Sequence, residues 1–139
     1  MIRKVDHIGI AVSNIQESLK IWKDLFGFDV FGKETVEEEG IVLAFLKKEG
    51  VPPIELIAAL DEDSPIKKFL EKRGEGIHHI CFEVDDIETA LESVKEKGVR
   101  LIHEEARKGA EGSQIVFIHP KSVNGVLVEL KEKKRFDLK

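Results

Sequence analysis

The chain has 139 residues, of which 42% are hydrophobic and 35% charged, and its net charge is −5. This size and apolar content suit one domain with a hydrophobic core, and the acidic balance argues against nucleic acid as a partner. No apolar run approaches the roughly 20 residues of a membrane span, and no signal peptide precedes the first strand pattern. A single cysteine, Cys81, excludes an internal disulfide and is typical of a reducing compartment. We therefore expect a cytoplasmic protein with neither a membrane nor a nucleic-acid partner.

The first half of the chain predicts a strand, a helix and then three strands. Asn14 or Ser13 is a typical helix cap, apolar residues then recur at helical spacing, and Gly27 ends the helix. Gly40 and the Gly50–Pro53 turn separate the three β-rich runs that follow. The predicted elements cover about 4–12, 15–26, 28–36, 41–47 and 54–59.

A short connecting helix and a second copy of the same pattern follow. Ser64-Pro65 predicts the start of a helix over 66–72, which Gly74 ends. Asp85 or Asp86 caps the next predicted helix, and Gly98 ends it. The elements predicted for this half cover about 77–84, 87–97, 100–103, 114–119 and 125–131.

The two halves are related by an internal repeat. Val5–Val12 aligns with Ile77–Val84 when His7 is placed on His79. The offset between equivalent landmarks is nearly constant, at 72 residues for this histidine pair, 71 for Gly27 and Gly98, and 74 for Glu55 and Glu129. A repeat of this kind constrains the whole architecture.

We therefore predict an α+β fold with two tandem βαβββ modules. Repeat 1 covers about 4–60, a connector helix lies within 61–75, and repeat 2 covers about 76–131, all in a single domain of residues 1–139. Each module would bury one sheet face under its own helix. The two half-sheets would then form a curved mixed sheet around a common cleft.

Four residues occupy equivalent places in the repeats and suit a metal ion. His7 and His79 lie early in each first strand, and Glu55 and Glu129 lie in each last strand. A bare carboxylate inside an apolar strand is costly to bury, and a bound cation relieves that cost. Two imidazoles and two carboxylates suit a divalent metal with open positions, so these four residues are the predicted ligands.

The other histidines and Cys81 are predicted to be structural. Residues two apart in a strand share a face, so Cys81 lies on the face of His79 whereas His78 points the other way. His103 and His119 have no identifiable partner and are expected at a loop or a strand end. The 131–135 run, rich in lysine and arginine, is expected to be a solvated tail.

These features resemble the vicinal oxygen chelate superfamily, which includes glyoxalase I, extradiol dioxygenases and methylmalonyl-CoA epimerase. Three stretches are similar to the epimerase family: 5–12, 76–87 and 119–130. The Asp63-Ser-Pro-Ile66 and Lys108-Gly-Ala-Glu-Gly112 segments match the same pattern. The resemblance extends from about Val5 to Leu130 and is more specific in the second half.

The resemblance implies epimerisation of (R)- and (S)-methylmalonyl-CoA, an isomerase reaction of propionate metabolism. A proton would leave and return at C2 through an enolate that a divalent metal stabilises as a Lewis acid. Co²⁺ is the expected metal, with Ni²⁺, Mn²⁺, Zn²⁺ or Mg²⁺ as alternatives. His7, His79 and Glu129 match the family's ligands, and two carboxylates would act as acid and base on opposite faces.

The chain departs from the family pattern at two positions. Bacterial relatives commonly have glutamine where this chain has Glu55, and a separate glutamate base where it has Leu43. Our hypothesis is that Glu55 works opposite Glu129, as paired glutamates do in glyoxalase I. The acidic turn formed by Glu37, Glu38 and Glu39 offers fallback candidates for the second base.

An acyl-CoA substrate carries phosphates and therefore needs cations. Lys121 in the 119–122 segment and the Arg107-Lys108 pair beside Gly109 are the candidate residues. Proteins of this superfamily usually pair, so we also expect a homodimer. The edges of a strongly curved sheet would be covered by such pairing.

Other functions remain open at this point. The four predicted ligands are also the ligand set of glyoxalase I, which isomerises a glutathione hemithioacetal by similar chemistry. An extradiol dioxygenase would need only three ligands and usually a chain of double length. A metal-free ligand-binding protein of the same fold would not need two histidines and two glutamates at repeat-related places.

Overall fold

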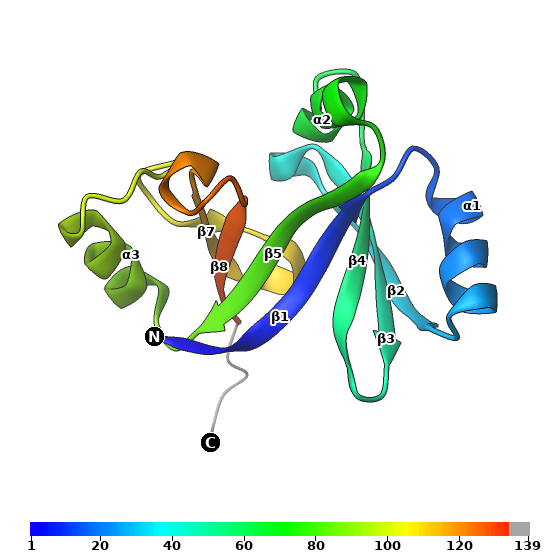
Figure 1. Cartoon of the computed structure of the whole chain (residues 1–139), viewed down its shortest axis with the longest axis horizontal. Helices are drawn as coiled ribbons and strands as arrows, with labels where there is room; N and C mark the ends of the chain where they lie inside the picture. Colours follow the sequence, from blue (N-terminus) through cyan, green and yellow to red (C-terminus); the bar gives the residue numbers. More distant parts are fainter. Residues whose placement is uncertain (134–139) are drawn as a thin grey trace. The chain divides into compact units, whose positions relative to one another are not determined.

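The computed structural model describes residues 1–133, and these form two compact units (Figure 1). The first unit is His7–His78. The second unit consists of Met1–Asp6 and the described residues from His79 onward. The strands are β1 (Ile2–Ala11), β2 (Asp29–Val36), β3 (Ile41–Lys48), β4 (Val51–Ala59), β5 (Gly76–Val84), β6 (Arg107–Lys108), β7 (Gln114–Ile118) and β8 (Val128–Glu132). The helices are α1 (Ile15–Lys20), η1 (Ile21–Leu25), η2 (Glu37–Glu39), α2 (Pro65–Arg73), α3 (Ile87–Glu96), η3 (Ala110–Gly112) and η4 (Pro120–Ser122).

The first unit is a four-stranded mixed sheet with a helix on one face. Its strand order is β2-β3-β4-β1, with β1 parallel to β4 and the other pairs antiparallel. The core lies between this sheet and α1, which is drawn beside the strands in Figure 1. Leu19 of α1 packs there with Leu46 of β3 and with Ile54 and Leu56 of β4. The strand residues that alternate with these ones therefore face away from α1.

The second unit repeats this arrangement. Its strand order is β5-β8-β7-β6, with β5 parallel to β8 and the other pairs antiparallel. Figure 1 shows α3 beside β7 and β8. The apolar stripe of α3, which includes Leu91 and Val94, packs against Val116 of β7 and Leu130 of β8. The βαβββ pattern of each half, and the α+β class, are confirmed.

Polar caps explain where the two main helices begin. Asn14 Oδ1 accepts a hydrogen bond from the Glu17 N–H at 3.0 Å, and Asp86 Oδ1 accepts one from the Glu88 N–H at 3.2 Å. Each cap satisfies a backbone donor that has no partner within the helix. Gly98 follows α3 with φ 70°, a left-handed conformation that favours glycine. Within residues 1–133, no helix is long and apolar enough to cross a membrane.

Several predicted elements have different bounds. The predicted helix over 15–26 continues as a π-helix, Ile21–Leu25, after its first turns. The predicted strand over 100–103 is not formed, and Leu101 makes only an isolated bridge to Ile118. The prediction of a solvated tail is wrong for Lys131, whose side chain in β8 is only 3% exposed. Arg135, at the end of that predicted tail, lies outside the described residues.

Candidate functional site

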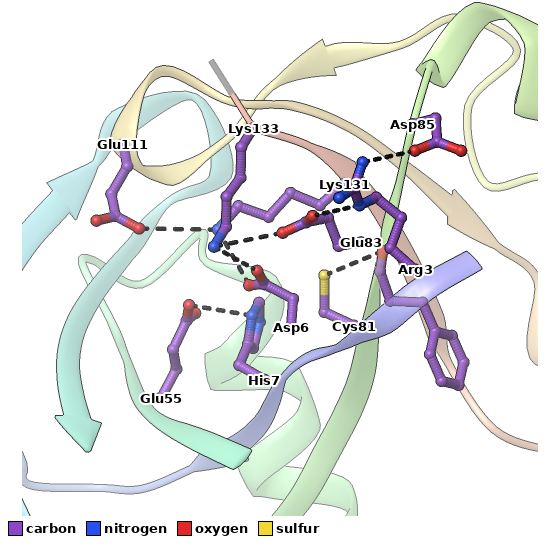
Figure 2. Close-up of polar contacts among 11 residues, drawn as sticks. Arg3, Asp6, His7, Glu55, Cys81, Glu83, Asp85, Glu111, Lys131 and Lys133 are labelled. Atoms are coloured by element: carbon purple, nitrogen blue, oxygen red, sulfur yellow. Dashed lines mark hydrogen bonds and ion pairs between the residues drawn. The ribbon is translucent and has the colours of Figure 1, made fainter. Parts of the chain in front are cut away.

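His7 and Glu55 form a buried pair in the first unit. Glu55 on β4 is the register partner of Gly9, which lies two residues after His7 on β1. Both side chains therefore lie on the face away from α1. His7 Nδ1 is 3.2 Å from Glu55 Oε2 (Figure 2), and both side chains are almost completely buried.

His79 and Glu129 form the equivalent pair in the second unit. Glu129 on β8 is the register partner of Cys81, two residues after His79 on β5. His79 Nε2 is 3.0 Å from Glu129 Oε1, and both side chains are buried. The strand register is thus the same in the two units, so the repeat in the sequence corresponds to a repeat in the pairing of strands.

Each pair is suited to be two neighbouring ligands of one metal ion. Nitrogen and carboxylate ligands lie about 2.0–2.2 Å from a metal such as zinc, which puts neighbouring ligand atoms about 3 Å apart. The separations of 3.2 Å for His7–Glu55 and 3.0 Å for His79–Glu129 agree with this spacing. Imidazole and carboxylate are also the donors that divalent transition metals accept. The residues therefore fit the implied metal.

A phenylalanine lies beside the glutamate of each pair. Phe45 on β3 is the register partner of Glu55, and Phe117 on β7 is the register partner of Glu129. Cross-strand partners share a face of the sheet, so each phenylalanine lies on the face of its glutamate. The sequence analysis missed this pair, although its offset of 72 residues equals that of the histidines.

Leu43 lies on the same face as Glu55, two residues before Phe45 on β3. Its side chain is buried opposite Ile57. A carboxylate at this position would therefore face the same side as the His7–Glu55 pair, and this chain has an apolar group there. Glu37 and Glu38 on η2 are exposed, whereas Glu39 is partly buried.

Lys131 is a buried cation on the face that carries Glu129. The two residues are two apart on β8, and Lys131 Nζ lies 3.3 Å from Asp6 Oδ2 (Figure 2). The Asp6 side chain is 7% exposed, so the ion pair is almost fully removed from water. Lys131 Nζ is also 3.8 Å from Oε1 of Glu111. Strand alternation from Glu129 could have placed Lys131 on this face, but its burial could not be inferred from sequence.

The charged groups continue from this pair as an alternating network in the second unit. Lys133 Nζ lies 3.4 Å from Asp6 Oδ1 and 3.4 Å from Glu83 Oε1, and Arg3 then joins Glu83 to Asp85. Desolvation lowers the pKa of Lys133, but the two carboxylates outweigh it and the pKa is raised. The network links the first residues of β1 to β5 and β8.

The remaining histidines have local partners. The His78 ring packs edge-on against Phe69, with ring centroids 4.9 Å apart. The His103 Nε2 atom accepts a hydrogen bond from the Arg107 guanidinium. Desolvation, and then the charge of Arg107, lower the pKa of His103. His119 Nδ1 accepts a hydrogen bond from the Lys121 N–H at 3.1 Å. The loop and strand-end positions predicted for His103 and His119 are confirmed.

The three candidate phosphate-binding residues lie on two elements. Arg107 and Lys108 form β6, and Lys121 lies on the short helix η4. Lys108 and Lys121 are exposed, and Arg107 is partly buried against His103.

Comparison with known proteins agrees with this fold. Residues 6–117 match the model of the glyoxalase/bleomycin resistance protein/dioxygenase superfamily. The mitochondrial methylmalonyl-CoA epimerase of Dictyostelium discoideum is 45% identical over 133 residues, which cover 95% of this chain and 80% of that protein.

Solved structures give the same result. The methylmalonyl-CoA epimerase of Mycobacterium tuberculosis superposes with a TM-score of 0.92 at 39% identity, covering 96% of this chain and 90% of that one. A methylmalonyl-CoA epimerase in complex with methylmalonyl-CoA and NH4+ superposes with a TM-score of 0.90 at 37% identity, covering 96% of each chain. The chain therefore belongs to the methylmalonyl-CoA epimerase family of isomerases, within the glyoxalase/bleomycin resistance protein/dioxygenase superfamily.

Proposed function

We propose that this protein interconverts (R)- and (S)-methylmalonyl-CoA by removing and returning the proton at C2. The observation that carries the proposal is the pair of buried His–Glu contacts, His7–Glu55 and His79–Glu129, in the same strand register of the two units. The solved structure of a relative with 37% identity is a complex with methylmalonyl-CoA, which supports this choice of substrate.

We further propose that the two units form one domain in which His7, Glu55, His79 and Glu129 hold one divalent metal ion. Co²⁺ is the first candidate, and Ni²⁺, Mn²⁺, Zn²⁺ and Mg²⁺ are alternatives. The bound ion would supply Lewis-acid stabilisation of negative charge on the substrate oxygens. The separations within each pair and the burial of all four side chains support this proposal.

Glu129 and Glu55 are the proposed acid and base. A carboxylate oxygen of one residue would take the C2 proton on one face, and a carboxylate oxygen of the other would return a proton on the opposite face. Leu43 supports the role of Glu55, because it leaves no carboxylate at the position where the family resemblance implies a separate second base. General base catalysis of this kind is typically worth about 10²–10⁴-fold in rate.

Arg107, Lys108 and Lys121 are the proposed partners of the coenzyme A phosphates. The exposed side chains of Lys108 and Lys121 support this role, since a charged ligand can reach them from solvent.

The test follows the C2 proton of methylmalonyl-CoA by NMR in D₂O, with chelator-stripped and with Co²⁺-loaded protein. We expect metal-dependent loss of the C2–H signal well above the buffer rate. Glu129→Gln and Glu55→Gln should each slow this exchange by about 10²-fold or more. Absence of exchange in folded, metal-loaded protein would refute the proposed reaction. Full turnover by Glu55→Gln would refute the role of Glu55 as a base.

A glyoxalase I reaction is the second candidate. It is favoured by one feature, the presence of Glu55 rather than glutamine at the third ligand position, which gives two histidines and two glutamates. Methylglyoxal with glutathione is the substrate to test under the same metal conditions. Turnover of this mixture without exchange of methylmalonyl-CoA would establish the second candidate in place of the first.

A further inference from the structure

Phe117 lies beside the proposed base Glu129 in the second unit. The two residues are register partners on β7 and β8, so their side chains leave the sheet on the same face as neighbours. Val116 and Ile118, the residues on either side of Phe117, face α3 in the core. Phe117 therefore faces away from the core.

The Phe117 ring is directed toward the His79–Glu129 pair. Its centroid is 6.0 Å from that of the His79 ring, and the two planes are nearly perpendicular at 87°. In the first unit, the Cδ2 atom of the repeat-related Phe45 lies 3.9 Å from where a Cβ of Gly32, on the edge strand β2, would be. Phe117 thus has its ring against the predicted metal ligand His79.

Glu129 has a different neighbour on its other side. Its register partner on β5 is Cys81, a small side chain that is completely buried. Phe117 is partly exposed. Of these two neighbours, Phe117 is thus the one with surface available to a ligand.

These positions determine which side chain lies near the reacting carbon of a substrate whose proton is taken by Glu129. The carbon that gives up the proton must come within hydrogen-bond reach of a Glu129 oxygen, roughly 3 Å. Cross-strand neighbours have Cβ atoms only about 4.5–5.5 Å apart, so a group attached to that carbon is within reach of the Phe117 ring.

We propose that Phe117 determines the size of the C2 substituent that the enzyme accepts. The inference rests on the proposed epimerisation and specifies its substrate range. The ring forms a rigid apolar wall that accommodates a methyl group and obstructs longer alkyl chains. In a hydrophobic pocket one methylene typically changes discrimination by about 10–200-fold, so a shorter side chain at 117 should alter the substrate range measurably.

The experiment measures C2–H exchange in D₂O for three substrates, methylmalonyl-CoA, ethylmalonyl-CoA and butylmalonyl-CoA, with the metal-loaded full chain. Phe117→Leu and Phe117→Ala should each raise the butyl-to-methyl rate ratio by about tenfold or more. Phe82→Leu is the matched control. Phe82 neighbours Cys81 on β5 but packs against the α3 core on the opposite face, so its replacement should leave the ratio unchanged.

The ratio separates a specificity role from a structural one, because loss of folded protein lowers all three rates together. An unchanged ratio in folded Phe117→Leu, or an equal rise in Phe82→Leu, would overturn the inference. If the unsubstituted protein exchanges none of the three substrates, the proposed reaction fails. If methylmalonyl-CoA exchanges but the butyl-to-methyl rate ratio is unchanged in the Phe117 variants, only the specificity role of Phe117 is refuted.

Discussion

At the scale of single residues, the two units share a strand register but differ in the side chains at equivalent positions. Both units place a histidine two residues before the register partner of a glutamate. Two residues further along, the first unit pairs Ala11 with Ile57, whereas the second pairs Glu83 with Lys131. At this position of the register, the second unit therefore has a charged pair and the first unit an apolar pair. This asymmetry gives the two glutamates different electrostatic surroundings within the same strand register.

His103 gives a prediction at this scale. Desolvation and then the charge of Arg107 lower the pKa of His103 below its ordinary value of 6.5. The folded state thus takes up this proton less readily than the unfolded state, so His103 reduces stability as the pH falls through 6.5. We expect an NMR titration midpoint below 6.5 for His103, and a higher midpoint in Arg107→Ala.

The His103 resonance can be assigned by its loss in His103→Gln. A midpoint at or above 6.5 in the unsubstituted chain would contradict the neutral imidazole that accepts a hydrogen bond from Arg107.

At the scale of elements, capping fixes where the helices that cover the two sheets begin. Asp86 caps α3 through the Glu88 N–H and also accepts a 2.7 Å hydrogen bond from the Thr89 hydroxyl. Because α3 supplies Leu91 and Val94 to the core, fraying at this end loosens the packing of the second unit. A second carboxylate, Glu132 Oε1, accepts a hydrogen bond from the Ile87 N–H at 2.7 Å and ties this helix start to β8.

Asp86→Ala should lower the free energy of unfolding by about 1 kcal/mol, as loss of an N-cap typically does. Urea unfolding followed by circular dichroism measures this change. Glu92→Ala, at an exposed position in the middle of α3, is the control and should change stability by less than about 0.5 kcal/mol. Equal effects of the two substitutions would show that the cap does not stabilise the helix.

At the scale of the whole molecule, the Asp6–Lys131 pair connects residues 125 positions apart in the sequence. Both side chains are buried, so removing the lysine takes away the buried cation beside the Asp6 carboxylate, which keeps the more exposed Lys133 at 3.4 Å. Lys131→Met should therefore destabilise the protein in urea unfolding, by at most about 3–5 kcal/mol, the cost of a buried charge with no partner. The double variant Asp6→Asn/Lys131→Met should recover a large part of this loss, because neither buried charge remains.

Lys67→Met is the matched control for this experiment. Lys67 forms an ion pair with Glu62 at 2.7 Å, but the pair is exposed to solvent, so the urea midpoint should not change. If the double variant is as unstable as Lys131→Met, the loss of stability cannot be attributed to the Asp6 carboxylate that has lost its buried cation.

Metal binding should also stabilise the whole molecule if the four predicted ligands hold one ion. If Co²⁺ binds only to the folded state, a free concentration 100 times its Kd raises the free energy of unfolding by about 2.7 kcal/mol. We expect a chelator to remove this stabilisation. His7→Ala and His79→Ala should each abolish most of it. Thermal unfolding with and without Co²⁺ measures both effects. The gain should weaken at acidic pH, because protonated imidazole cannot bind the metal. Retention of the full effect in either variant would exclude that histidine as a ligand.

The sequence by itself determined the α+β class, the two βαβββ patterns and the equivalent places of one histidine and one glutamate in each repeat. These features depend on local periodicity, on caps such as Asp86 and on the constant offset of the repeat, all of which are properties of neighbouring residues or of an alignment. The joint ligation of a metal by His7, Glu55, His79 and Glu129 stays a prediction.

Only the tertiary structure decided the burial of Lys131, the packing of Phe117 against His79 and the absence of a strand at 100–103. A lysine near the end of a charged run has the local signature of a solvated residue, and its partner Asp6 lies at the other end of the chain. Likewise, Phe117 reads as an ordinary strand residue until the register places it beside Glu129. Local sequence determines which face of the sheet a side chain occupies. The pairing of distant strands determines which residues lie beside it on that face.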